Sequence, residues 1–213
     1  MTTIALTLFG IAALIFGSES LWRLKLLQPE TARKIIHLSV GCVIAAWPHF
    51  ISYQAIQLLS LVMLIGIYVS YKYKIFGSIH SVKRSTRGEL LYPISIGICA
   101  LLEPAPWIFT AAILHLAIAD GLAAMVWTKV NGRTGYKILG HQKSLIGTGV
   151  FFITSLIIIS VSFAGFATYD LAGVTPLTIL AIAATATIVE NISWYGLDNL
   201  TVPITVVLAL SMV

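Results

Sequence analysis

Acidic side chains occur inside or beside apolar segments of this sequence. Asp120 lies within an apolar run, about two helical turns before the basic Lys129. Glu190 lies at a similar distance before Asp198, which together with Asn199 opens the last apolar run. An ionised group at the centre of a membrane-spanning helix costs roughly 2.5–3.5 kcal/mol, so such groups usually face a polar cavity. Because oxygen ligands suit Mg²⁺, we predict a magnesium site from these residues: Asp120, Glu190, Asp198 and Asn199.

Basic residues that could bind phosphate fall in three windows, which hold all 13 Lys and Arg: Arg23 to Lys34, Lys72 to Arg87, and Lys129 to Lys143. Lysine neutralises phosphate, glycine permits close backbone approach, and a helix N-terminus offers free N–H groups to an anion. The sequence lacks the G-x-x-x-x-G-K-[ST] pattern of a Walker A loop. The predicted nucleotide- and phosphate-binding residues are Arg33, Lys34, Arg84, Arg87, Glu89, Lys137, Ser144 and Gly147, and the predicted catalytic residues are Asp120, Lys143 and His37.

Each candidate also has a structural explanation. Asp120 could form a salt bridge to a basic partner, and Glu190, with Asn191 beside it, could have a structural role. Arg33 and Lys34 could anchor a helix end at the membrane surface, with His37 satisfied in the core. The second basic window could act only as a topology signal or attract anionic lipid.

At two predicted helix starts, the residues could either cap the helix or belong to the site. Ser144 precedes a long apolar run and could be its N-cap. Asp198 and Asn199 could likewise cap the last run, which has Pro203 in or near its first turn.

Apolar helices must position these residues. The 213 residues are 58% hydrophobic and 10% charged, and the mean hydropathy is +0.96. Stretches of about 18 or more apolar residues are long enough to cross a bilayer. We predict an all-α, polytopic transmembrane helical bundle of about 7–8 spans that forms one domain over residues 1–213. The apolar runs are roughly 3–20, 35–50, 52–71, 90–103, 106–127, 145–166, 173–195 and 200–213.

The basic windows predict the orientation of the bundle. With eight spans they follow the first, third and fifth runs, so they share one face. The positive-inside rule then places this active face in the cytoplasm and the N-terminus outside. Residues 3–20 lack the features of a signal peptide, so we expect a retained span. The predicted location is an integral, multi-pass position in the cytoplasmic membrane of a bacterium or otherwise in an organelle membrane.

Acids that could hold Mg²⁺ and bases that could hold a polyphosphate thus converge at the mouth of a lipid-facing bundle. Such a site suits transfer between a water-soluble nucleotide and a lipid. Phosphoryl transfer needs mainly positioning and charge neutralisation, which this set of residues can supply. Cys42 and Cys99, in contrast, show no metal-ligand spacing. The expected partners are a nucleotide, a membrane-embedded lipid and the bilayer, and nucleic acid is not among them.

Five segments in order carry a family resemblance: RKIIHLSVG (33–41), RSTRGELLYP (84–93), DGLAA (120–124), KSLIG (143–147), and Glu190 followed by GLDNLTVP (196–203). On these segments the chain resembles the dolichol kinase and phytol kinase group, which is related to CTP-using membrane transferases such as phosphatidate cytidylyltransferase. The resemblance implies an Mg²⁺-dependent kinase that uses CTP to phosphorylate an isoprenoid alcohol of the phytol, prenol or dolichol type, or in some members diacylglycerol.

The resemblance also implies roles for individual residues. Asp120 would be a metal ligand or the base toward the hydroxyl, and Lys143 would hold phosphate together with Arg33 and Lys34. Arg84 and Arg87 would close over the nucleotide. Glu89 would orient one of these arginines. The sequence departs from the usual family pattern at Ile146, where K-S-x-E-G has glutamate, and at Ala119 and Trp127, where the family commonly has glycine.

Two other functions remain open from the sequence. A cytidylyltransferase that makes a CDP-lipid could use the same cations and metal. A proton-coupled transporter could use Asp120 and Glu190 as relay residues. Against a transporter, the sequence shows no inverted repeat or pair of broken helices, and the acids lie near one face rather than at the midplane.

Overall fold

A computed structural model describes residues 2–73, 75, 88–130, 135–165 and 174–213. A helix occupies each predicted apolar run, so the helical fold class is confirmed. The α-helices are α1 (Thr2–Arg23), α2 (Pro29–Ala45), α3 (Tyr53–Tyr73), α5 (Gly88–Leu101), α6 (Pro106–Leu114), α7 (Asp120–Val130), α8 (Leu145–Gly165), α9 (Pro176–Ile192) and α10 (Asp198–Ser211). A 3-10 turn, η1 (Trp47–His49), follows α2, and a π-helical segment, η2 (His115–Ala119), joins α6 to α7.

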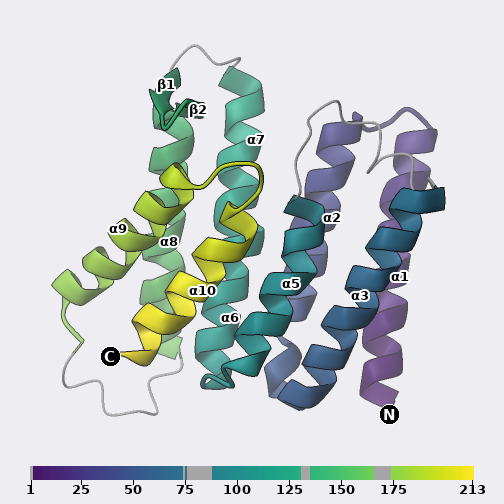
Figure 1. The fold of residues 1–213 in the computed structure, drawn as a ribbon, viewed down its shortest axis with the longest axis horizontal. Coiled ribbons are helices and arrows are strands. Elements are labelled where there is room, and N and C mark those ends of the chain that lie inside the picture. The colour runs from purple at the N-terminus through teal and green to yellow at the C-terminus, as the bar shows by residue number, and fades with distance from the viewer. Residues whose placement is uncertain (1, 74, 76–87, 131–134, 166–173) are drawn as a thin grey trace.

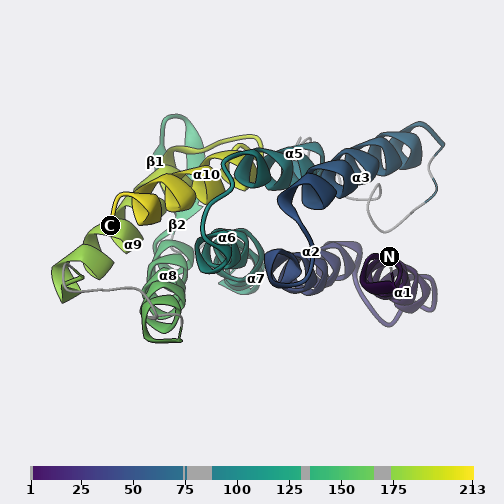
Figure 2. The same ribbon diagram turned by 90° about the horizontal axis from the view of Figure 1, so that it is seen from below.

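The helices form two rows, which Figure 2 shows end-on. One row contains α8, the α6–α7 rod, α2 and α1, and each member packs on the next. The other row contains α9, α10, α5 and α3, also packed in sequence. Contacts of α8 with α9 and of α6 with α10 join the rows. Residues far apart in the chain therefore meet between the rows.

When α6, η2 and α7 are counted as one rod, successive helices run in opposite directions along the bundle (Figure 1). Both termini lie at the lower end of that view. The end of α1, the start of α2, the end of α3 and the strands β1 (Gly135–Ile138) and β2 (His141–Ser144) lie at the upper end. The described parts of the three basic windows therefore share one end of the bundle, as predicted.

Four helical segments are long and apolar enough to cross a membrane: Ile4–Arg23, Tyr53–Tyr73, Pro106–Val126 and Leu145–Gly165. Three apolar helices are shorter: Gly88–Leu101, Pro176–Ile192 and Asp198–Ser211. These segments indicate an integral membrane protein. The number of 7–8 spans and the outside N-terminus stay predictions.

Small residues bring α2 against the central rod. A Cβ atom added at Gly41 would collide with the side chains of Ala117 and Tyr92. Glycine at this position therefore permits the close approach of α2 to η2. The same approach carries His37, one turn earlier on α2, to the backbone of Leu116. Gly41 of the first family-like segment thus has a packing role that positions a candidate site residue.

A short antiparallel hairpin departs from the purely helical prediction. Its strands are β1 (Gly135–Ile138) and β2 (His141–Ser144), with Tyr136 paired opposite Lys143. The two residues between them, Leu139 and Gly140, have φ angles of 47° and 85°. Positive φ at both positions is what a type I′ hairpin turn requires. The hairpin delivers Lys143 and Ser144 directly to the start of α8.

Candidate active site

The central rod changes its helical form immediately before Asp120. The π-helical segment η2 covers His115–Ala119, and α7 begins at Asp120. Such segments are rare and frequently occur at functional sites, because they redirect the side chains that follow. The Asp120 side chain, 25% exposed, lines a cavity between the two rows of helices.

This cavity has a volume of ≈ 410 Å³, within the range of roughly 300–1,000 Å³ that is typical of small-molecule sites. One part of its wall is polar and the other is apolar. The polar wall contains Arg33, Lys34, His37, Glu89, Asp120, Asp198 and Asn199. These residues come from α2, α5, α7 and α10, and all of them were predicted from the sequence as site residues. The structure therefore assembles a large part of the predicted site in one cavity.

His37 stands beside Asp120 in this polar wall. Its Nε2 atom lies 2.9 Å from the carbonyl oxygen of Leu116 and 3.7 Å from Oδ2 of Asp120. Because a carbonyl oxygen can only accept, Nε2 is the donor in the shorter contact. The ring also packs on Tyr92, with the ring centroids 4.5 Å apart. The backbone thus holds His37 in place, and its ring restricts one side of the Asp120 carboxylate.

Arg33 and Glu89 form a second, looser pair across the cavity. Arg33 Nη1 lies 3.9 Å from Glu89 Oε1, at the outer limit for an ion pair. Glu89 was predicted to orient an arginine, and among the described residues Arg33 is the arginine it meets. Arg84 and Arg87, the predicted partners, lie outside the described residues.

Asp198 and Asn199 enter the cavity at the start of α10. Leu197 occupies the N-cap position and no side chain caps this helix, so the alternative that Asp198 is the N-cap is wrong. Instead, Oδ1 of Asp198 accepts a hydrogen bond of 3.0 Å from the backbone N–H of Asn199. The side-chain oxygen of Asn199 is buried without a hydrogen-bond partner among the described residues. A Cβ atom added at Gly88 would collide with the amide nitrogen of Asn199, so glycine there lets α5 approach the site.

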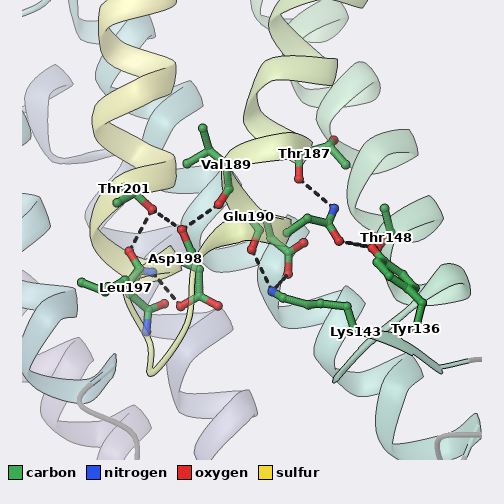
Figure 3. A network of polar contacts seen from close by, with 12 residues as sticks. Tyr136, Lys143, Thr148, Thr187, Val189, Glu190, Leu197, Asp198 and Thr201 are labelled. Carbon is green, nitrogen blue, oxygen red and sulfur yellow. Dashed lines mark hydrogen bonds and ion pairs between the residues drawn. The ribbon is translucent and has the colours of Figure 1, made fainter. Parts of the chain in front are cut away.

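The turn between α9 and α10 is fixed by hydroxyl groups (Figure 3). Ser193 donates to the carbonyl oxygen of Val189 at 2.6 Å and lies 2.7 Å from the Thr201 hydroxyl. Thr201 donates in turn to the carbonyl oxygen of Leu197 at 2.9 Å. These contacts hold the end of α9 against the first turn of α10 and so determine where Asp198 lies.

Lys143 and Glu190 form a close ion pair beside the hairpin. Lys143 Nζ lies 2.6 Å from Glu190 Oε1 and donates to the Glu190 carbonyl oxygen at 2.8 Å (Figure 3). Their side chains are only 16% and 10% exposed. The sequence predicted Lys143 as a phosphate ligand and Glu190 as a metal ligand. Here each side chain neutralises the other. This contact agrees with the alternative that Glu190 has a structural role.

Tyr136 makes a second attachment between the hairpin and α9. Its hydroxyl contacts the side-chain oxygen of Asn191, and lies 2.8 Å from the Thr148 hydroxyl (Figure 3). Thr148 also donates to Asn191 at 3.0 Å, and the Asn191 amide donates to the Thr187 carbonyl oxygen at 2.8 Å. We call the set Tyr136, Lys143, Thr148, Glu190 and Asn191 the hairpin clamp. Sequence reasoning did not assign roles to Tyr136 or Thr148, because their meaning depends on the strand register.

Other predicted residues lie apart from the cavity wall. Ser144 accepts a hydrogen bond of 3.2 Å from the Gly147 backbone, so it is the N-cap of α8, as the alternative for this residue stated. Lys137 is exposed and pairs opposite Gln142. Because strand side chains alternate, Lys137 faces away from Lys143. Ile146, which replaces a family glutamate, is exposed.

The magnesium prediction is only partly reflected in the arrangement. Asp120, Asp198 and Asn199 line one cavity, whereas Glu190 is engaged by Lys143. Among the described residues, no group of three or more His, Cys, Asp or Glu side chains is already arranged to hold a metal. The magnesium site stays a prediction.

Comparison with known proteins supports the family resemblance. A phytol kinase from Synechocystis sp. (strain ATCC 27184 / PCC 6803 / Kazusa) is 35% identical over 204 residues, which cover 91% of this chain and 84% of the relative. No family model and no solved structure matches the chain. On the basis of this match, the chain belongs to the phytol kinase and dolichol kinase family.

Proposed function

We propose that this protein is an integral membrane kinase that transfers the γ-phosphate of CTP to the hydroxyl of an isoprenoid lipid alcohol. One observation carries the proposal: a single cavity between apolar helices combines cationic and acidic side chains with an apolar wall. The related phytol kinase supports the choice of a lipid alcohol as acceptor. The positive-inside rule places this end of the bundle in the cytoplasm, where CTP is present.

In the proposed reaction the acceptor hydroxyl lies beside Asp120. The hydroxyl oxygen attacks the γ-phosphorus, the bond to the bridging β–γ oxygen breaks, and CDP leaves. The hydroxyl proton passes to the Asp120 carboxylate, which His37 restrains from one side at 3.7 Å. Arg33 and Lys34 are placed to neutralise phosphate charge, the main requirement of phosphoryl transfer.

The oxygen atoms in the cavity fit Mg²⁺. This ion prefers carboxylate and carbonyl oxygens, and Asn199 offers a buried side-chain oxygen without a hydrogen-bond partner among the described residues. Asp198 and Asn199 would hold the ion, and the second oxygen of Asp120 could complete its protein ligands. When bound, Mg²⁺ would reduce the negative charge of the polyphosphate.

The decisive experiment follows the label from two forms of CTP. Purified protein in detergent with Mg²⁺ is given CTP labelled on the γ- or the α-phosphate. The acceptors are phytol, geranylgeraniol, a polyprenol, diacylglycerol and phosphatidate. We expect γ-label in the isoprenoid alcohols. Transfer of α-label to phosphatidate would show that the protein is a cytidylyltransferase. Transfer of γ-label to diacylglycerol alone would show that the acceptor is diacylglycerol and not an isoprenoid alcohol. No transfer by folded protein would contradict the proposal.

A further inference from the structure

The cavity continues from its polar wall as an apolar groove between α1, α2 and α3. The side chains of its apolar wall are Ile11, Ile15, Ile36, Val40, Met63 and Ile67. On α3, the lining positions Met63, Gly66, Ile67 and Ser70 recur every three or four residues and so share one helix face. From Ser70 to Met63 this face covers about two turns, or roughly 10 Å.

The groove begins where the proposed chemistry takes place. Arg33 and Lys34 lie at the start of α2 and Ser70 near the end of α3, which Figure 1 places at the same end of the bundle. Further along α2, His37 and then Val40 line the same cavity. A ligand with a polar head at Asp120 and an apolar tail would therefore find matching surroundings along its length.

From this continuity we propose that the groove binds the isoprenoid tail of the acceptor alcohol and that Gly66, which has no side chain, keeps the groove open for long tails. The inference rests on the proposed function, because it assumes that the ligand is a lipid alcohol. Gly66 lines the cavity, and a Cβ atom added there meets no atom within 4 Å. A side chain added at this position therefore starts in open space beside the groove.

Shape should govern selection here more than hydrophobicity. A tail that leaves the bilayer for the groove exchanges one apolar environment for another, so transfer out of water contributes little. Steric overlap with an added side chain, in contrast, carries a penalty equivalent to roughly a fivefold to hundredfold loss of affinity. Substitution of Gly66 should therefore penalise long tails and leave short ones nearly unaffected.

The test compares Gly66→Phe with the matched variant Gly17→Phe. Gly17 is also an exposed glycine in an apolar helix, and a Cβ atom there meets no atom within 4 Å, but Gly17 is not among the residues that line the cavity. For Gly66→Phe we expect kcat/KM to fall about tenfold or more with phytol, but by about twofold or less with 3-methylbut-2-en-1-ol, a five-carbon isoprenoid alcohol that is shorter than the roughly one helical turn between Ser70 and Gly66. Gly17→Phe should leave both values close to those of the unsubstituted protein. Gly66→Leu supplies the same comparison if the phenylalanine variant fails to fold.

A binding measurement separates the groove from the reaction. A ligand that binds the folded state raises the unfolding temperature, so phytol should stabilise the unsubstituted protein and Gly17→Phe more than Gly66→Phe. Three results would contradict the proposal that the groove binds the tail. They are equal stabilisation of both variants, no stabilisation of the unsubstituted protein, and equal losses of kcat/KM with both alcohols. Phosphorylation of phytol with no difference between the variants would retain the kinase and reject the groove. Selective binding of phytol without phosphoryl transfer would support the groove and reject the kinase.

Discussion

The cavity and the hairpin clamp contain the same kinds of charged residue but differ in how tightly those residues are paired. In the clamp, Lys143 and Glu190 approach to 2.6 Å, and Lys143 also bonds the Glu190 carbonyl oxygen. In the cavity, Arg33 lies 3.9 Å from Glu89, and Asp120 lies 3.7 Å from His37. The clamp is a closed network, whereas in the cavity the side-chain oxygen of Asn199 is buried without a hydrogen-bond partner among the described residues.

This difference helps to separate structural charges from reactive ones. A buried ion pair with short hydrogen bonds has little capacity left for a ligand, and its loss is felt mainly as instability. Charged groups that line an open cavity at longer distances can exchange partners for a substrate at lower cost. We therefore expect substitutions in the cavity to affect turnover and substitutions in the clamp to affect stability first.

Asp120→Asn should produce the largest change in turnover. The amide keeps the size of the side chain but cannot accept the hydroxyl proton, and general-base catalysis contributes about 10²–10⁴-fold. We expect activity with phytol to fall by that factor while the unfolding temperature stays close to that of the unsubstituted protein. Initial rates with γ-labelled CTP and a thermal unfolding curve on the same preparation measure both quantities.

The same variant tests whether Asp120 takes part in the reaction. Near-normal turnover by Asp120→Asn would remove Asp120 from the reaction and leave the cavity as a binding site only. Proton-coupled uptake into liposomes that disappears in this variant would favour a transporter instead.

Lys143→Ala and Glu190→Gln should each destabilise the protein by about 3–5 kcal/mol, since either leaves a largely buried charge without its partner. The double variant Lys143→Met with Glu190→Leu removes both charges and should recover much of that loss. Chemical unfolding of the three proteins in one detergent measures the difference.

Activity of the double variant decides what else Lys143 does. Normal turnover would show that the pair is architectural, whereas a stable but inactive protein would support the predicted phosphate contact. Lys137→Ala is the control for stability, because this exposed lysine lies on the opposite face of the hairpin and should leave the free energy of unfolding unchanged. Comparable destabilisation by Lys137→Ala would contradict the assignment of the effect to the ion pair.

The apolar runs predicted the helices, and the charged residues beside them, together with the family resemblance, predicted part of the cavity. Hydropathy located the helix that carries Asp120 and the one that begins near Asp198, and the alternation of direction placed both at the basic end. The hairpin was missed because its turn has Leu139 before Gly140, without the Asn-Gly or Asp-Gly signal of a type I′ turn. The pairing of Lys143 with Glu190 depends on that register, and no local pattern encodes it.

The helix lengths show a second limit of the sequence. Apolar composition indicates which segments avoid water but not how far each extends across a bilayer. The helices Gly88–Leu101 and Asp198–Ser211 have only 14 residues each, while about 20 are needed to cross fully. The π-helical segment before Asp120 is also a product of packing, because its alanines and leucine fit a regular α-helix equally well.

Asn199→Ala should have an intermediate effect that is confined to the Mg²⁺ concentration the protein requires. Loss of one oxygen ligand should raise the Mg²⁺ concentration for half-maximal activity by about tenfold, as expected for one interaction with a charged group. Asn199→Asp keeps the oxygen and should restore the requirement. Activity is measured against Mg²⁺ concentration at saturating CTP. An unchanged requirement in Asn199→Ala would exclude this residue from the magnesium site.

Tyr136→Phe should have the smallest effect and tests the clamp at its edge. The substitution removes the hydroxyl that contacts Asn191 and Thr148, but Thr148 still donates to Asn191 at 3.0 Å. No buried acceptor loses its last partner, so the cost should stay near the usual value of about 1 kcal/mol for one hydrogen bond. We expect a slightly lower unfolding temperature and unchanged turnover. A loss of turnover near that of Asp120→Asn would show that the hairpin itself takes part in the reaction, and the division between a structural clamp and a reactive cavity would then fail at its weakest contact.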